Sequence, residues 1–206
     1  MNIKNNLGHS ADISLTAELS IPINGNNIID FKKLARLYKD ELLDNVLPFW
    51  LEHSQDNEYG GYFTCLDRDG RVFDTDKFIW LQGREVWMFS MLYNKVEKRQ
   101  EWLDCAILGG EFLKKYGHNG NYNWYFSLDR SGRPLVEPYN IFSYTFATMA
   151  FGQLSLATGS QEYADIAKKT FDIILSKVDN PKGKWNKLHP GTRNLKNFAL
   201  PMILCN

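Results

Sequence analysis

The sequence predicts an all-α protein in which paired helices form a toroid, with about half of that toroid present and short β-hairpins in its long loops. The first observation behind this prediction is a segment at residues 62–71 that recurs at residues 125–133, at an offset of 62 residues. The second is that two segments with helical periodicity follow each copy. A unit of this kind buries its apolar faces only against neighbouring units, so the repetition favours a stacked or closed helical array.

The first long helix is expected to begin after Asp30, a residue suited to the N-cap, and to continue to about Trp50, because apolar residues follow helical spacing along it. Pro48 is expected to kink or end this helix. Residues 1–27 are polar and rich in Asn, and we expect them to form a flexible arm. Residues 28–206 then make up the partial toroid.

The remaining elements follow from turn signals and periodicity. A short strand is expected at Tyr62–Leu66, and Asp69-Gly70 is a strong signal for a hairpin turn, as is Ser131-Gly132 in the second copy. Short turns separate the second helix from the third and the fourth from the fifth, which predicts two antiparallel helical hairpins. The helices after the first are expected at residues 78–96, 101–116, 141–157 and 160–178, with another from near residue 195.

Composition excludes several classes of function. The formal net charge is zero, which argues against nucleic acid or an anionic membrane as the main partner. No apolar run has the length of a membrane span, and the first 25 residues contain no apolar signal core, so we expect a cytoplasmic protein. Three widely spaced cysteines fit a reduced compartment, and the four histidines show no metal-ligand spacing, so no metal site is predicted.

Arg84 is the first candidate for chemistry, because an arginine on a predicted inner helix is costly unless it is paired or faces a wet cavity. Its guanidinium offers five N–H donors in a fixed fork, which suits a carbonyl or a developing oxyanion. Helical spacing places Trp80, Arg84 and Trp87 on one stripe, whereas Gln82 points elsewhere. The alternative is a buried Arg84 that pairs with Glu85 or another structural carboxylate.

Two other functions remain open from the residues alone. Glu58 and Glu137 lie near loop ends, where the acid pair of a glycoside hydrolase could lie. A non-catalytic helical protein could instead bind a sugar or a partner chain through the concave face of a half ring.

Several segments resemble the N-acylglucosamine 2-epimerases, also called renin-binding proteins. The Trp-Leu-Gln-Gly-Arg sequence at residues 80–84 is the specific part of this resemblance, which covers about residues 30–206. The supporting segments are residues 60–72, 77–88, 109–113, 141–143 and 201–204.

This resemblance implies an (α/α)6 barrel, in agreement with the predicted toroid, and an isomerase that interconverts N-acetylglucosamine and N-acetylmannosamine for sialic acid metabolism. The family removes the C2 proton of the ring-opened sugar and returns it to the other face, using two histidines. The arginine matching Arg84 would stabilise the enolate, and Trp80, Trp87 and Gln82 would be substrate-binding residues. No cofactor is required, although some members bind ATP as an effector, and many are homodimers.

The resemblance also has departures. In the family the two catalytic histidines lie in the later half of the barrel, and none of the four histidines here falls at those positions. We therefore expect the N-terminal half of an epimerase, truncated at its C-terminus, whose partner would be the missing half. Related cellobiose 2-epimerases carry His-x-His where this chain has Pro201-Met202-Ile203, so the resemblance favours an N-acetylhexosamine as substrate.

Overall fold

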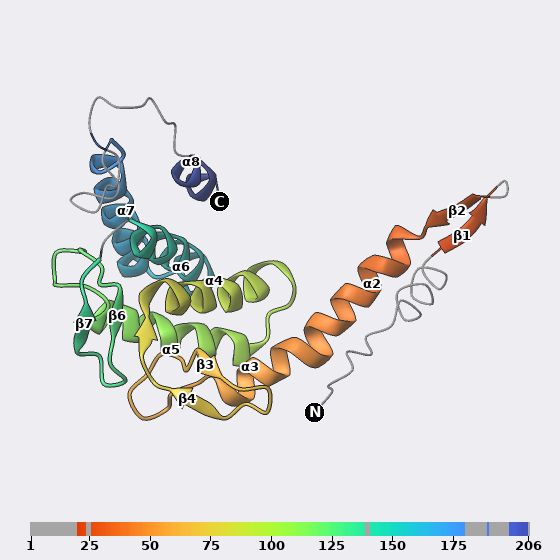
Figure 1. The fold of residues 1–206 in the computed structure, drawn as a ribbon, viewed down its shortest axis with the longest axis horizontal. Helices are drawn as coiled ribbons and strands as arrows, with labels where there is room; N and C mark the ends of the chain where they lie inside the picture. The colour runs from red at the N-terminus through yellow and green to blue at the C-terminus, as the bar shows by residue number, and fades with distance from the viewer. Residues whose placement is uncertain (1–19, 24–25, 139–140, 180–188, 190–197, 206) are drawn as a thin grey trace. The chain divides into compact units, whose positions relative to one another are not determined.

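The structure is a computed structural model that describes residues 20–23, 26–138, 141–179, 189 and 198–205. It divides into two compact units, Met1–Trp50 and Leu51–Asn206 (Figure 1).

The first unit contains a β-hairpin followed by helix. Strand β1 (Ser20–Ile23) pairs antiparallel with β2 (Asn26–Ile29). Helix α2 (Phe31–Glu41) begins after Asp30, whose carboxylate accepts hydrogen bonds from the backbone N–H groups of Lys32 and Lys33 at 3.0 and 3.1 Å. This confirms the predicted N-cap.

The helical segment passes through Pro48 instead of ending there. A π-helical turn, η1 (Leu42–Val46), follows α2 and leads into α3 (Leu47–His53). Proline donates no hydrogen bond, and its ring would clash with the carbonyl of the preceding turn, so a wider turn just before it accommodates the ring. The flexible arm at residues 1–27 stays a prediction. Part of it forms the hairpin, and residues 1–19 and 24–25 lie outside the described residues.

The second unit is built from two helical hairpins. The inner helices α4 and α6 pack side by side, and the outer helices α5 and α7 each pack against the inner helix that precedes them (Figure 1). The helices predicted at residues 78–96, 101–116, 141–157 and 160–178 are confirmed, with boundaries that differ by no more than two residues. The start expected near residue 195 for the last helix lies outside the described residues. The bounds are α4 (Ile79–Lys95), α5 (Gln100–Tyr116), α6 (Phe142–Thr158), α7 (Gln161–Ser176) and a short α8 (Ala199–Leu204).

Local capping explains why these boundaries were predictable. The Ser160 hydroxyl accepts a hydrogen bond from the backbone N–H of Tyr163 at 3.4 Å and so caps α7. Gly159 ends α6 in the left-handed conformation at a φ of 73°, which glycine adopts without steric cost.

The β-hairpins tie the two repeats together. Strand β3 (Cys65–Leu66) pairs with β4 (Val72–Asp74), and β6 (Ser127–Leu128) pairs with β7 (Pro134–Val136). The first strand is shorter than predicted. An additional strand, β5 (Lys77–Phe78), pairs with β6 immediately before α4 begins, so a segment of the first repeat is hydrogen bonded to the second.

The core of this unit is formed mainly by side chains of α4, α5, α6 and α7. Burying each large apolar side chain there contributes about 1.5–3 kcal/mol. The largest apolar side chains of this unit that are almost fully buried are Trp102, Trp124, Tyr62, Tyr144, Phe89, Phe151, Ile79, Leu113, Leu128 and Ile141.

Candidate functional site

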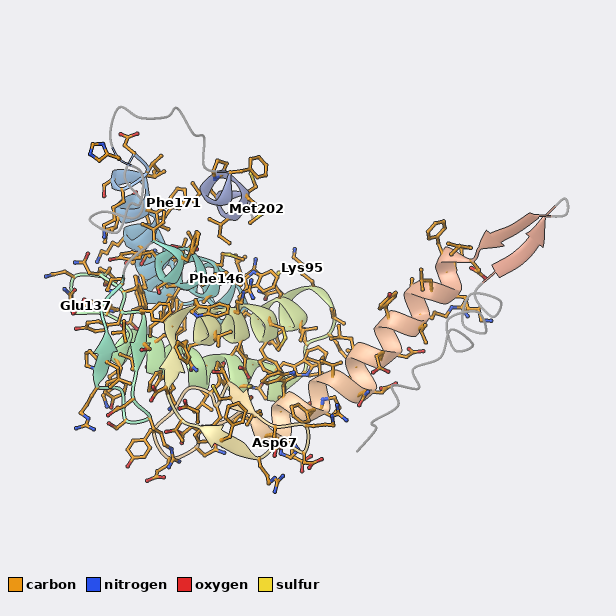
Figure 2. The ribbon with its side chains drawn as sticks, viewed as in Figure 1. Asp67, Lys95, Glu137, Phe146, Phe171 and Met202 are labelled. Carbon is orange, nitrogen blue, oxygen red and sulfur yellow. The ribbon has the colours of Figure 1, made fainter. Side chains whose placement is uncertain are left out.

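The candidate site lies on the first turns of α4, where Arg84 is solvent exposed. Its guanidinium carbon lies 5.3 Å from the centroid of the Trp80 ring and 4.7 Å from that of the Phe146 ring on α6. The centroids of the Trp80 and Phe146 rings are 6.2 Å apart, and the planar guanidinium contacts both (Phe146 is labelled in Figure 2). These two rings, one from each inner helix, are called the aromatic seat of Arg84. Such cation–π contacts hold a guanidinium in place without using its N–H donors.

The Arg84 guanidinium has N–H donors that a bound ligand could use. Among the described residues, none forms an ion pair or a hydrogen bond with its guanidinium. The alternative of a buried Arg84 paired with Glu85 is wrong, because Arg84 is exposed while the Glu85 carboxylate is buried and bonded to Ser54. An unpaired, ring-supported guanidinium can donate to an oxygen of a bound ligand.

The other predicted site residues have different surroundings. Trp87 lies one helical turn beyond Arg84 on the same stripe and is half-buried. Gln82 is fully buried, and its side-chain amide both accepts from the backbone N–H and donates to the backbone carbonyl of Tyr62, each at 2.8 Å. These two bonds hold the loop before β3 against α4, so the contacts of Gln82 are structural.

Phe146 was not among the predicted site residues. It lies 62 residues after Arg84, which is the offset that separates the two copies of the repeat. The repeat was therefore the signal that could have identified it, since matched positions of two adjacent inner helices face the same side of the array.

Glu85 faces away from the site into the core. The Ser54 hydroxyl donates to its carboxylate at 2.5 Å. Burial raises the pKa of Glu85 to about 8, and the hydrogen bond from Ser54 offsets only part of this effect. Glu85 is thus mostly protonated at neutral pH.

A buried ion cluster fixes the strand that precedes α4. Lys77 is fully buried and donates to the Asp56 carboxylate at 2.9 Å and to the backbone carbonyls of Gly60 and Arg130 at 2.6 and 3.0 Å. The Arg130 guanidinium also donates two hydrogen bonds to Asp56, each at 3.0 Å. Burial alone would raise the pKa of Asp56, but the bonds from Arg130 and Lys77 outweigh it and lower the pKa to about 2.

Glu58 and Glu137, the two acids of the glycoside hydrolase alternative, both lie in exposed positions. Glu58 forms an exposed ion pair with Arg130 at 3.0 Å, and Glu137 is exposed on the segment after β7. His118 is half-buried between the rings of Tyr122 and Trp124, more enclosed than its loop position predicted. Within the part of the chain that the structure describes, no group of His, Cys, Asp and Glu could hold a metal ion.

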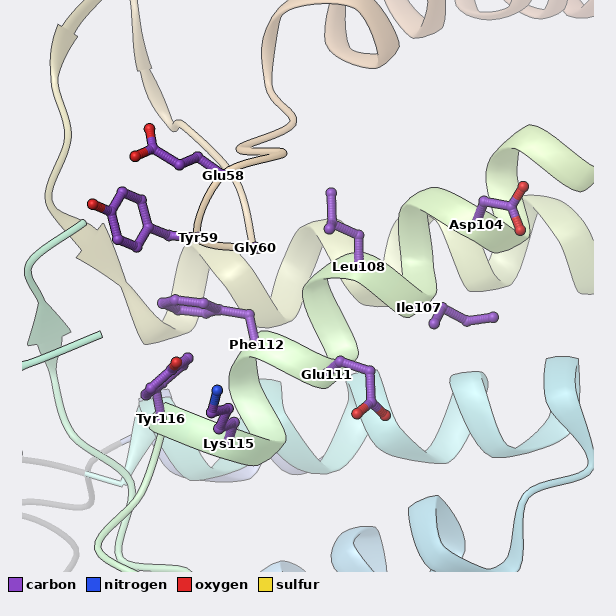
Figure 3. A pocket seen from close by; sticks show the side chains of 10 residues that line it. All are labelled: Glu58, Tyr59, Gly60, Asp104, Ile107, Leu108, Glu111, Phe112, Lys115 and Tyr116. Atoms are coloured by element: carbon purple, nitrogen blue, oxygen red, sulfur yellow. The ribbon is translucent and has the colours of Figure 1, made fainter. Parts of the chain in front are cut away.

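A separate hollow of about 580 Å³ lies along the outer helix α5 (Figure 3). Phe112, Tyr116 and Leu108 line it, and Tyr59 stands across from them on the loop before β3. It contains none of the residues of the Arg84 site. Glu111, one of its acids, is already engaged by Lys114 at 2.8 Å and by the Tyr163 hydroxyl at 2.5 Å.

The inner and outer helical layers, joined by loops that carry β-hairpins, are those of a helical toroid. The family model described as N-acylglucosamine 2-epimerase (GlcNAc 2-epimerase) matches residues 61–205, and the chain belongs to this family. It is 43% identical to N-acylglucosamine 2-epimerase from Bos taurus over 183 residues, or 85% of this chain, and 42% identical to the Homo sapiens enzyme over 169 residues, or 80% of this chain.

Solved structures identify the architecture. The fold matches cellobiose 2-epimerase from Bacillus thermoamylovorans B4167 with a TM-score of 0.65 and 28% identity, over 70% of this chain and 37% of that one. The predicted (α/α)6 barrel is confirmed, with part of it present in this chain. The chain spans 43% of the bovine relative and 40% of the human one. None of the helices within the described residues is long and apolar enough to cross a membrane.

Proposed function

We propose that this chain supplies the N-terminal half of a sugar 2-epimerase site that interconverts N-acetylglucosamine and N-acetylmannosamine. The observation that carries the proposal is the exposed, unpaired Arg84 guanidinium seated on Trp80 and Phe146. The relatives named N-acylglucosamine 2-epimerase supply the substrate class.

The chemistry requires an electrophile beside the sugar carbonyl. The proton at C2 of the open-chain sugar is only weakly acidic, so its removal needs a base and a group that stabilises the negative charge developing on the carbonyl oxygen. Arg84 has the donors for that oxygen, and Trp80 and Trp87 have apolar surfaces that could pack against the sugar. The proposal requires no cofactor. ATP as an allosteric effector and a homodimer stay predictions.

A second candidate function is sugar binding without catalysis. It is favoured by the surroundings of two histidines on the described part of the chain. His53 packs against the turn at Gly70, and His118 packs against Trp124. The two histidine rings are thus packed against other parts of the chain, which favours a structural role for both.

The test is deuterium exchange at C2 of N-acetylmannosamine in D2O, followed by NMR with the 206-residue chain. If the chain alone exchanges this proton, Arg84→Ala should slow the exchange by about 100-fold or more, the scale of losing one oxyanion donor. Arg68→Ala is the matched control, because Arg68 is also exposed but lies at the tip of the first hairpin. A near-normal rate in Arg84→Ala would contradict the role of Arg84.

Saturation-transfer NMR with the same sugar separates the two candidate functions if no exchange occurs. Binding that depends on Arg84, without exchange, would support the sugar-binding function for this chain. A folded wild-type chain that shows neither binding nor exchange would contradict both functions.

A further inference from the structure

The inner helices approach each other closely at Gly83, the residue just before Arg84. A Cβ atom placed on Gly83 would lie 2.9 Å from the backbone oxygen of Phe146, 3.0 Å from its carbonyl carbon and 3.1 Å from its Cβ. Real Cβ atoms essentially never show a contact as short as the first of these, and the other two are tighter than nine in ten real Cβ contacts. Because two of the three obstructing atoms are backbone, they cannot move aside without moving α6.

Two other helical glycines, Gly110 of the outer helix α5 and Gly152 of the inner helix α6, have different surroundings. A Cβ on Gly110 would meet the end of the Leu154 side chain, which can change rotamer, and a Cβ on Gly152 would have no atom within 4 Å. Gly83 therefore differs from both in facing the backbone of the neighbouring inner helix.

The aromatic seat of Arg84 lies where α4 and α6 come closest to each other. Phe146, whose backbone touches Gly83, also carries the ring that lies 4.7 Å from the Arg84 guanidinium carbon. Widening the gap between α4 and α6 would lift the guanidinium off this ring, while Trp80 would stay beside it because both residues are on α4. The separation of the two helices thus determines where the N–H donors of Arg84 lie.

We infer that Gly83 is a positioning residue for Arg84: its lack of a side chain allows the close approach of α4 to α6 that seats the guanidinium between Trp80 and Phe146. This inference rests on the proposed function for its consequence in sugar chemistry. The positioning itself is a property of the free protein and can be measured without any sugar.

The direct test is the side-chain Nε–H resonance of Arg84, assigned by its loss in Arg84→Lys. In the wild type, the ring currents of Trp80 and Phe146 should shift this resonance away from that of the exposed Arg68. Gly83→Ala should move it toward the Arg68 position, whereas Gly152→Ala, the matched glycine of α6, should leave it unchanged. An unchanged Arg84 resonance in folded Gly83→Ala would overturn the inference.

If Gly83→Ala does not fold, the close approach of Gly83 to Phe146 can be measured in the wild type. Nuclear Overhauser contacts between the Gly83 Hα atoms and the Phe146 Hβ atoms should accompany the ring-shifted Arg84 resonance. Absence of either signal in the folded wild type would overturn the inference.

The sugar readout distinguishes this inference from the proposed function. Gly83→Ala should reduce Arg84-dependent exchange or binding by about 10- to 100-fold, as expected for a misplaced catalytic group. If Arg84→Ala has no effect on the sugar while Gly83→Ala still moves the resonance, the proposed function fails and the positioning stands. If Arg84→Ala impairs the sugar readout and Gly83→Ala changes neither signal, the positioning fails.

Discussion

Arg84 and Glu85 are adjacent in the sequence but occupy opposite environments. Successive residues of a helix point about 100° apart, so one side chain can reach solvent while the next is enclosed in the core. Arg84 is exposed to solvent. Glu85 is buried with one hydroxyl partner, and its environment favours the neutral acid.

Glu85 should make the stability of the protein fall as pH rises. Its pKa is raised from 4.5 to about 8 in the folded state, so the folded protein binds this proton more tightly than the unfolded chain does. The free energy of unfolding should decrease between about pH 4.5 and pH 8, by roughly 5 kcal/mol in total for this one group.

Glu85→Gln should remove this dependence, because an amide keeps a hydrogen bond to Ser54 and does not ionise. Urea unfolding at pH 5 and pH 9 measures it, with the variant gaining stability over the wild type at pH 9. Glu101→Gln, an exposed glutamate of α5, is the control and should retain the wild-type pH dependence. Parallel pH profiles for the wild type and Glu85→Gln would contradict the assignment.

At the scale of elements, the two copies of the repeat share their turn conformation as well as their sequence pattern. In the first turn the Asp67 carboxylate accepts from the backbone N–H of Arg71, and in the second the Asp129 carboxylate accepts from that of Arg133. The backbone N–H groups of Gly70 and Gly132 donate to the carbonyls of Asp67 and Asp129, both at 3.0 Å. These closed turns confirm the hairpin turns predicted at Asp69-Gly70 and Ser131-Gly132.

Gly132 should be the more sensitive of two left-handed glycines. Its φ is 95°, and a Cβ would lie 2.5 Å from Cγ of the Tyr116 ring, whereas Gly159 has a φ of 73° and open space around it. Gly159→Ala should cost about 1 kcal/mol for the left-handed conformation alone. Gly132→Ala should cost at least about 1 kcal/mol more, because the ring must also move.

Chemical denaturation of the two variants, read by circular dichroism, measures this difference. Equal losses of stability in the two variants would mean that the Tyr116 ring moves aside at no measurable cost and that only the left-handed backbone conformation is costly.

The elements that could be predicted from the sequence are those with strong local signals. Asp30, Ser160 and Gly159 mark helix ends through their own side chains or conformation, so their positions were confirmed. Strand β5 has only two residues and forms because β6 of the next repeat pairs with it, a contact with no local pattern. The π-helical turn before Pro48 likewise depends on how the chain accommodates one ring.

In the candidate site, too, the contacts within one helix could be predicted from the sequence, and those between distant segments could not. Helical spacing correctly placed Trp80 beside Arg84, because both lie on one helix. The contacts of Gln82 with Tyr62 could not be anticipated, since they join residues 20 positions apart through a loop whose path is set by the fold.

At the scale of the whole second unit, Asp56 connects three segments that are distant in sequence. It lies in the loop after α3, Lys77 lies in β5 and Arg130 lies in the turn of the second hairpin. Two cations share one buried carboxylate, so removing that carboxylate leaves Lys77 buried beside Arg130 without a compensating charge. Breaking a buried pair in this way costs about 3–5 kcal/mol.

Asp56→Asn should therefore destabilise the unit by roughly 3–5 kcal/mol, measured by urea unfolding at pH 7. Glu58→Gln is the matched control, because Glu58 contacts the same Arg130 at 3.0 Å but its side chain is 61% exposed, and it should cost no more than about 1 kcal/mol. Because the cluster joins both hairpin loops, fluorescence of Trp80 in the first repeat and of Trp124 in the second, read in single-tryptophan variants, should report one shared transition at the lower midpoint. A loss of no more than about 1 kcal/mol in both Asp56→Asn and Glu58→Gln would contradict the cost assigned to leaving the buried Lys77 without the Asp56 carboxylate.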